Sequence, residues 1–211
     1  MPRKGWADRE DGVHGIVSKG IVATSKFLSH VLRHEPETIG LEIDPEGWAM
    51  VDQLVSLASK HGTVLTREWL LEIVAASGKK RFALSQDDSR IRANHGHSIQ
   101  VNLGFQPQTP PRILFHGTAT RFEASIRAQG LIAGSRQYVH LSADREAAIH
   151  VGKRYGKPLL LEVEALAMCG SGYEFFMSEN GIWLTRAVPT GYLRFPDSSG
   201  NYSNKNRRRN E

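Results

Sequence analysis

Arginine and histidine occur together in several short stretches of this 211-residue chain, next to glycine and serine. The first stretch, LSHVLRHEP, puts Arg33 and His34 at the end of an apolar segment, just before Pro36. Basic side chains near a helix C-terminus complement the helix macrodipole by ~0.3–1 kcal/mol, which alone explains their presence. They also bind phosphate oxygens well, because a guanidinium donates two parallel hydrogen bonds to one anion. This stretch by itself leaves both interpretations open.

The second stretch, RIRANHGHS, begins at Arg90 and combines two arginines with a turn. Arg90 and Arg92 are predicted to share one face of a strand, because side chains alternate with a period of two. The turn adds His95, His97 and Ser98. A strand face with two arginines is most often only a solvated face. Zinc binding by the two histidines is an alternative, but no third ligand has a suitable spacing.

The third and fourth stretches lie in the second half of the chain. FHGT closes an apolar segment with His-Gly-Thr, and YVHLSADREAAIHVGKRYGK passes from a predicted strand into a predicted helix. A capped turn with a hydrogen-bonded histidine explains the first of them equally well. The residues of these two stretches that could bind a ligand are His116, Gly117, Thr118, His140, Ser142 and Arg154.

Several common catalytic signatures are absent from the sequence. No G-x-G-x-x-G, G-x-x-x-x-G-K-[ST], H-E-x-x-H or C-x-x-C pattern occurs. Their absence argues against Rossmann-type dinucleotide binding and P-loop phosphoryl transfer. The single cysteine, Cys169, excludes an internal disulfide and a cysteine-based metal framework, and it fits a reducing compartment. We therefore expect no metal.

The composition indicates a globular protein with a positive net charge. Hydrophobic residues make up 40% and charged residues 23%, and the net charge of +5 permits a polyanionic partner. No apolar run approaches the ~20 residues of a membrane span. The N-terminal MPRKGWADREDGVHGIVSKG lacks the apolar core of a signal peptide. We therefore expect a cytoplasmic monomer with no membrane partner.

Apolar spacing in the first half of the chain predicts three short helices followed by a hairpin. RFALS and RIRAN form the hairpin on either side of the polar QDDS. The expected N-terminal caps of the helices are Thr24 or Ser25, then Asp52, then Thr66. This set of elements suggests a winged-helix lobe over residues 23–105, preceded by a flexible extension over residues 1–22.

A second lobe is predicted over residues 110–195, after the Pro-rich join QPQTPPR at 106–112. ILFHGT, YVHLS and PLLLEVEA are predicted strands, and Ser142 is expected to cap the helix that follows the second of them. FFMSENGIWLT is a predicted hairpin around the two-residue turn Asn180-Gly181. Residues 196–211 are predicted to form a basic, disordered tail. The fold class is therefore α+β, with antiparallel pairing in the second lobe.

The motifs LRHxP, IRAxxGHS, HGT, VHLS and GKRYGK occur in an order and at intervals that strongly resemble the RNA 2'-phosphotransferase family, also described as tRNA 2'-phosphotransferase. The resemblance runs from about Ser25 to Pro189. It implies a winged-helix RNA lobe followed by an ADP-ribosyltransferase-like lobe that binds NAD. One position departs from the family pattern, because His95 stands where the family usually has Gln. This departure affects only a direct amide contact at that point.

The resemblance also implies roles for individual residues. The implied essential quartet is Arg33, His34, Arg92 and Arg154. The residues implied to bind the RNA substrate are Arg33, Arg92, His97 and Ser98. The residues implied to bind NAD are His116, Gly117, Thr118, His140, Ser142 and, at the third position of the fold's signature, Ile182. Glu179 lies near that position, and we interpret it as a turn residue rather than a catalytic carboxylate.

The implied reaction consumes NAD in two steps. An internal RNA 2'-phosphate attacks the ribose C1 of NAD and expels nicotinamide. The neighbouring ribose hydroxyl then attacks that phosphate, which releases 2'-OH RNA and ADP-ribose 1'',2''-cyclic phosphate. The phosphate is already an anion and nicotinamide leaves as a neutral molecule, so the first step needs positioning rather than a strong acid or base. Arginines supply it, at ~1.5–3 kcal/mol for each charge-assisted hydrogen bond.

Two other functions stay open at this point. One is an ADP-ribosyltransferase that caps the terminal phosphates of RNA or DNA, which would leave a stable ADP-ribose adduct. The other is a winged-helix nucleic-acid-binding module without catalysis, which would release no nicotinamide. The second is disfavoured because a pure binding module does not need HGT and VHLS in a second lobe.

Overall fold

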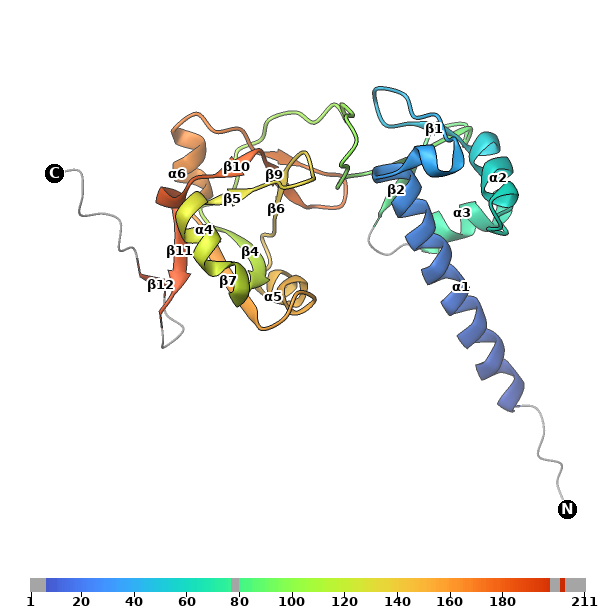
Figure 1. Cartoon of the computed structure of the whole chain (residues 1–211), viewed down its shortest axis with the longest axis horizontal. Helices are drawn as coiled ribbons and strands as arrows, with labels where there is room; N and C mark the ends of the chain where they lie inside the picture. Colours follow the sequence, from blue (N-terminus) through green and yellow to red (C-terminus); the bar gives the residue numbers. More distant parts are fainter. Residues whose placement is uncertain (1–6, 77–79, 198–201, 204–211) are drawn as a thin grey trace, which may run out of the picture. The chain divides into compact units, whose positions relative to one another are not determined.

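The computed structural model describes residues 7–76, 80–197 and 202–203 of the chain, with side chains described from Gly20 onward (Figure 1). Both helices and strands are present, and every described strand pair is antiparallel. The α+β class predicted from the sequence is therefore confirmed. Within the described ranges, no helix has the length and apolar character needed to cross a membrane.

The chain divides into two compact units, Met1–Leu103 (unit 1) and Gly104–Glu211 (unit 2). The described part of unit 1 combines one long helix, two shorter helices and a sheet of strand order β1-β3-β2. Its elements are α1 (Ala7–Arg33), η1 (Pro36–Ile39), β1 (Ala49–Met50), α2 (Val51–Lys60), α3 (Arg67–Ala76), β2 (Phe82–Leu84) and β3 (Arg90–Ala93). Side chains that are fully buried in its core include Leu28, Leu32, Leu54, Leu70 and Ile91. The helices and the hairpin expected here are present, while the winged-helix assignment stays a prediction.

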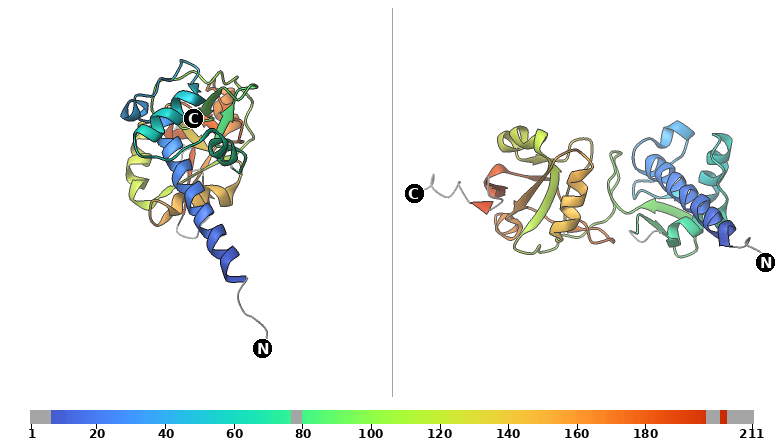
Figure 2. Two further views of the ribbon diagram at one scale, coloured as in Figure 1. Left: turned by 90° about the vertical axis from the view of Figure 1, so that its right-hand side faces the viewer. Right: turned by 90° about the horizontal axis from the view of Figure 1, so that it is seen from below.

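Helix α1 begins earlier than the sequence predicts. It starts at Ala7, whereas the sequence predicts a flexible extension over residues 1–22 and a cap at Thr24 or Ser25. Thr24 and Ser25 instead lie inside the helix and are buried. No proline occurs between residues 3 and 35, so the backbone does not interrupt the helix. Its N-terminal part extends beyond the other elements of unit 1 (Figures 1 and 2). Residues 1–6 lie outside the described ranges.

Only one of the other two predicted caps in unit 1 is correct. Thr66 does cap α3, because its hydroxyl accepts a hydrogen bond from the N–H of Trp69 at 3.1 Å. Asp52 does not cap α2 and accepts a hydrogen bond from Arg67 instead, at 3.0 Å. The first N–H of α2, that of Val51, donates to the carbonyl of Ser89 at 2.9 Å. The backbone carbonyl of Ser89, just before β3, therefore takes the place of a capping side chain at the start of α2.

Unit 2 contains a four-stranded sheet of order β12-β11-β7-β4, a three-stranded sheet of order β6-β9-β8 and the pair β10-β5. Its strands are β4 (Leu114–Ala119), β5 (Leu131–Ile132), β6 (Val139–Leu141), β7 (Pro158–Val163), β8 (Phe176–Met177), β9 (Trp183–Thr185), β10 (Ala187–Val188), β11 (Leu193–Pro196) and β12 (Tyr202–Ser203). Its helices are η2 (Thr120–Phe122), α4 (Glu123–Gln129), α5 (Arg145–Lys153), α6 (Ala165–Gly170) and η3 (Thr190–Tyr192). Fully buried side chains of its core include Leu114, Leu161, Met168, Phe175 and Leu184. The ADP-ribosyltransferase-like assignment stays a prediction.

An antiparallel bridge between Phe115 and Ser142 links the two larger sheets of unit 2 next to the HGT and VHLS motifs. The N–H of Phe115 donates to the carbonyl of Ser142 at 2.8 Å, and the N–H of Ser142 donates back at 2.9 Å. This antiparallel bridge places the residue before His116 beside the residue that ends VHLS. The HGT and VHLS motifs, which are far apart in sequence, therefore lie side by side.

The helix after VHLS is capped by a different residue from the one predicted. Asp144, not Ser142, is the N-cap of α5, because its Oδ1 accepts from the N–H groups of Glu146 and Ala147 at 2.8 and 3.2 Å. The hydroxyl of Ser142 accepts from the N–H of Asp144 at 3.0 Å and shapes the turn before the helix. A carboxylate is the stronger acceptor at a helix N-terminus, which explains the shift of two residues.

Two further predictions in unit 2 need correction. The hairpin around Asn180-Gly181 pairs Met177 with Trp183, so its loop spans residues 178–182 rather than two residues. The Ser178 side chain closes this longer loop by accepting from the N–H of Ile182 at 3.1 Å. The predicted tail contains a strand, since Tyr202 pairs with Pro196 and its hydroxyl donates to the carbonyl of Leu160 at 3.2 Å. Residues 198–201 and 204–211 of that tail lie outside the described ranges.

Candidate functional site

The C-terminal end of α1 in unit 1 is enclosed by the loop that follows β3. The N–H groups of Ser98 and Ile99 donate to the carbonyl of Arg33 at 2.9 and 3.3 Å. The Ser98 hydroxyl lies 3.0 Å from Nδ1 of His34. These contacts satisfy a carbonyl that a helix end leaves without an intrahelical partner. The LRH and GHS motifs, separated in sequence, therefore meet at one place.

The side chain of Arg33 is partly buried and directed toward the start of β2. Its Nη2 donates to the carbonyl of Arg81 at 3.4 Å, and its guanidinium carbon lies 5.9 Å from the ring centre of Phe82. A solvated cation that only complements the helix dipole would not need such contacts. The position of Arg33 is therefore set by tertiary structure as well as by the helix.

Arg92 shares one face of β3 with Arg90, as the sequence predicts, while the other two residues of the strand are buried. Both guanidinium groups lie over the ring of Trp48, at 5.3 Å for Arg90 and 4.6 Å for Arg92. Arg90 also lies 3.7 Å from a carboxylate oxygen of Asp44. A cation over a tryptophan face is attracted by the ring quadrupole. Trp48 therefore holds Arg92 in place without neutralising its charge.

His97 lies near Arg33 and Arg92, and its side chain is 2% exposed. Burial, together with the charges of Arg33, His95, His34 and Arg92, lowers the pKa of His97 to about 3. The ring is therefore neutral near pH 7. In the described part of the chain, neither of its ring nitrogens has a hydrogen-bond partner. Buried polar atoms are seldom left unpaired, so His97 retains unused hydrogen-bonding capacity beside the arginines.

In unit 2, the rings of the HGT and VHLS motifs are connected through the backbone. Nδ1 of His116 donates to the carbonyl of His140 at 3.0 Å. A carbonyl can only accept, so this nitrogen carries the proton and Nε2 is an acceptor. Burial lowers the pKa of His116, although its bond to the His140 carbonyl acts in the opposite direction. His116 therefore presents a neutral ring with an acceptor nitrogen.

The geometry assigns His140 the opposite tautomer. Nη1 of Arg136 lies 3.3 Å from Nδ1 of the His140 ring. A guanidinium can only donate, so Nδ1 of His140 accepts and its Nε2 carries the proton. The two histidines thus offer one acceptor and one donor. A ligand with hydroxyl and amide groups can use both.

Close packing of α5 on β4 explains both Gly117 and the first glycine of GKRYGK, Gly152. A Cβ atom on Gly117 would lie 1.6 Å from the carbonyl oxygen of Ala148, and one on Gly152 would lie 2.6 Å from that of Thr118. Only glycine permits so close an approach of strand and helix. Thr118 is itself buried at 7% exposure. Gly117 therefore has a packing role whether or not it contacts a ligand.

The remaining predicted residues also lie in unit 2. Arg154 ends α5 with an exposed side chain, and its N–H donates to the carbonyl of Val151 at 3.1 Å. Ile182 precedes Trp183, which pairs with Leu141 of VHLS. Glu179 lies in the turn of the hairpin, as expected. Unit 1 thus brings together Arg33, His34, Arg92, His97 and Ser98, and unit 2 brings together His116, His140 and Ser142.

Three residues that position the candidate site residues were not identified from the sequence. Trp48 lies between the turn at 45–47 and β1, Arg136 lies four residues before His140 in a non-helical segment, and Gly152 opens the GKRYGK motif. Only the glycine carried a local signal, since glycine inside a helical pattern often marks a close approach. Among the described residues, no group of three or more His, Cys, Asp or Glu side chains could hold a metal ion.

Comparisons with known proteins agree with the arrangement of these motifs. Residues 19–187 match the family described as RNA 2'-phosphotransferase, Tpt1 / KptA family. A protein of Acaryochloris marina named "Probable RNA 2'-phosphotransferase" is 56% identical over 171 residues, which cover 81% of this chain and 94% of that protein. A protein of the same name from Pseudomonas fluorescens is 53% identical over 177 residues, covering 83% of this chain and 97% of that protein.

Proposed function

The chain belongs to the RNA 2'-phosphotransferase family, and from this premise we propose that it is an NAD-dependent enzyme that removes an internal 2'-phosphate from RNA. NAD is consumed as a co-substrate. The products are 2'-OH RNA, nicotinamide and ADP-ribose 1'',2''-cyclic phosphate. Unit 1 binds the phosphate of the RNA, and unit 2 binds NAD.

The observation that carries the proposal is the arrangement of Arg33, His34 and Arg92 around the buried His97. The C-terminal end of a helix carries a partial negative charge and repels a phosphate. Two guanidinium groups nearby oppose that effect, and their contacts with aromatic rings help to hold them in place. Neutral His97 adds hydrogen-bonding capacity without adding charge. This combination suits a phosphate that must be held at several oxygens.

The residue types match what the chemistry requires. A phosphate is a nucleophile without further deprotonation, and nicotinamide is a neutral leaving group. The first step therefore depends on holding the 2'-phosphate in position, which arginine does through its planar pair of donors. In the second step, Arg33, Arg92 and Arg154 stabilise the charge that rearranges on the phosphate. His34 donates to a phosphate oxygen or accepts the proton of the attacking hydroxyl.

The residues of unit 2 fit a dinucleotide with neutral hydrogen-bonding groups. The Nε2 acceptor of His116 can bind a ribose hydroxyl, and the Nε2–H of His140 can donate to an oxygen. A backbone amide of the HGT segment can bind the nicotinamide carboxamide. Thr118, Ser142 and Ile182 complete the proposed NAD site.

Product analysis tests this proposal directly. An RNA oligonucleotide with one internal 2'-phosphate is incubated with the protein, NAD and EDTA, and a 2'-OH oligonucleotide of the same sequence is the control. We expect 2'-OH RNA, nicotinamide and the cyclic phosphate in equal amounts, and no reaction without NAD. A stable ADP-ribose adduct on a terminal phosphate would instead establish the capping activity. RNA binding without any nicotinamide release would establish a binding module.

A further inference from the structure

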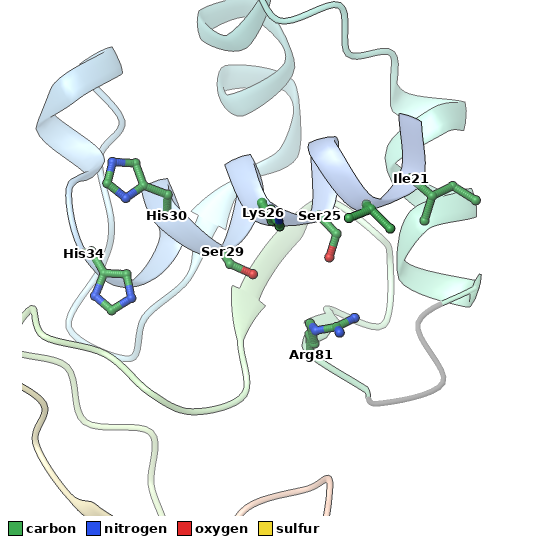
Figure 3. A pocket seen from close by; sticks show the side chains of 8 residues that line it. Ile21, Ser25, Lys26, Ser29, His30, His34 and Arg81 are labelled. Atoms are coloured by element: carbon green, nitrogen blue, oxygen red, sulfur yellow. The ribbon is translucent and has the colours of Figure 1, made fainter. Parts of the chain in front are cut away.

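A groove runs along α1 in unit 1, beside the candidate phosphate site (Figure 3). Its volume is about 370 Å³. The polar side chains that line it are Ser25, Lys26, Ser29, His30, His34 and Arg81. Ser25 and Ser29 project from the helix on the side of Arg81 (Figure 3). We refer to this feature as the α1 groove.

The charge of the α1 groove is positive. Lys26 is exposed and Arg81 is partly exposed, and none of the lining residues is acidic. At one end of the groove, the carboxylate of Glu35 lies 3.5 Å from Nε2 of His30. Glu35 therefore offsets charge at the end of the groove that His30 shares with His34. Lys26 and Arg81 define the cationic part of the groove.

The α1 groove is continuous with the candidate phosphate site. Val22, Lys26, His30 and His34 follow one another at intervals of four residues and so form one ridge of the helix. His34 belongs to both features, and the carbonyl of Arg81 accepts the hydrogen bond from Arg33. From Lys26 to His34 the helix rises by ~12 Å, which matches roughly three nucleotides of a stacked strand at ~3.4 Å each.

We propose that the α1 groove binds the single-stranded RNA that flanks the 2'-phosphorylated nucleotide, with Lys26 and Arg81 contacting backbone phosphates. The inference rests on the proposed function, because it takes the 2'-phosphate to lie at Arg33 and Arg92. The partly exposed Ser29 can donate to a phosphate oxygen or bond a 2'-hydroxyl. At the far end, the half-exposed Val22 offers an apolar surface to a base. An acidic peptide would match the charge but would have no reason to enter the phosphate site.

The test measures binding of a single-stranded RNA that carries a 2'-phosphate near its middle, without NAD, at several salt concentrations. Lys26→Ala and Arg81→Ala are each expected to weaken binding by about threefold to tenfold. Each should also reduce the slope of log K against log salt by ~0.7, because one phosphate contact is lost. Arg81→Ala keeps the carbonyl that holds Arg33. Lys60→Ala, an exposed cation at the end of α2 outside the groove, is the matched control and should change neither quantity.

A second readout separates the groove from the reaction. The ratio of kcat/KM for this RNA to kcat/KM for a 2'-phosphorylated dinucleotide should fall toward one in the Lys26→Ala and Arg81→Ala variants. If the wild-type protein converts the dinucleotide but the variants keep both the ratio and the salt slope, the groove assignment is wrong and the proposed function stands. If the variants lose salt-dependent binding but the wild type converts neither RNA, the proposed function is wrong. Displacement of the RNA only by an acidic peptide would also overturn the groove assignment.

Discussion

The two units prepare their candidate sites by different physical means. In unit 1, Arg33 and Arg92 are placed over aromatic rings next to the neutral, buried His97, so positive charge is concentrated where a helix ends. In unit 2, His116 and His140 are neutral rings fixed in opposite tautomers by a carbonyl and a guanidinium. The first arrangement suits a charged group, and the second suits a neutral ligand with matching hydrogen-bond donors and acceptors.

This difference predicts how each unit tolerates change. The unit 1 site depends on side-chain charge, so its substitutions should reduce activity with little loss of stability. The unit 2 site depends on a backbone approach between β4 and α5 that only glycine permits. A substitution there should therefore affect folding and ligand binding together.

The largest expected effect is that of Gly117→Ala. The added methyl group would lie 1.6 Å from a backbone oxygen of α5, so β4 and α5 must separate. We expect a loss of more than about 3 kcal/mol of unfolding free energy and a loss of NAD binding. Urea unfolding and NAD titration measure both. Gly170→Ala is the control, because no atom lies within 4 Å of the added methyl group and its stability should not fall.

Arg33→Lys should give the next largest effect, and on activity alone. Lysine keeps the charge that complements the helix dipole but loses the planar two-point contact with phosphate. The loss of one such bond corresponds to roughly 10- to 150-fold in rate. The melting temperature should stay close to that of the wild type. Near-normal turnover of 2'-phosphorylated RNA by Arg33→Lys would show that Arg33 only complements the helix dipole and does not bind the phosphate.

The burial of His97 should make the protein less stable in acid. The pKa of His97 is lowered to about 3 in the folded protein, from 6.5 in the unfolded chain. As the pH falls below 6.5, the unfolded chain takes up the proton first, so the unfolding free energy falls by up to ~1.4 kcal/mol per pH unit until about pH 3. Urea unfolding at several pH values should show a shallower dependence in His97→Gln. His61→Gln, at the exposed end of α2, controls for the loss of one histidine, and an equal change in it would contradict the assignment.

The smallest expected effect is that of Arg136→Ala on NAD. Without the guanidinium, the His140 ring can adopt either tautomer, and its Nε2 donor is present only part of the time. A hydrogen bond of ~0.5–1.5 kcal/mol corresponds to a weakening of roughly two- to tenfold in the KM for NAD. The KM for RNA should not change. Arg136→Lys supplies a donor again and should restore part of the loss, whereas equal changes in both KM values would argue for a general structural role.

Local patterns in the sequence predicted the motif stretches, the α+β class and the shared face of Arg90 and Arg92, because each depends on residue type and period. Features that depend on tertiary contacts were not predictable in the same way. The early start of α1 involves Thr24 packing into the core, and the β12 strand depends on Tyr202 reaching the carbonyl of Leu160. The supports of Arg92 and His140 come from Trp48 and Arg136, neither of which shows a motif.

The central claim is that unit 1 binds the phosphate of RNA and unit 2 binds NAD. Equilibrium titration of NAD and of 2'-phosphorylated RNA into Arg92→Ala and His116→Asn tests it most directly. Asparagine can keep the bond to the His140 carbonyl but removes the Nε2 acceptor. We expect Arg92→Ala to lose RNA affinity by about tenfold or more while NAD affinity stays within about twofold, and His116→Asn to show the reverse. Loss of NAD affinity in Arg92→Ala, with RNA affinity unchanged, would contradict the account.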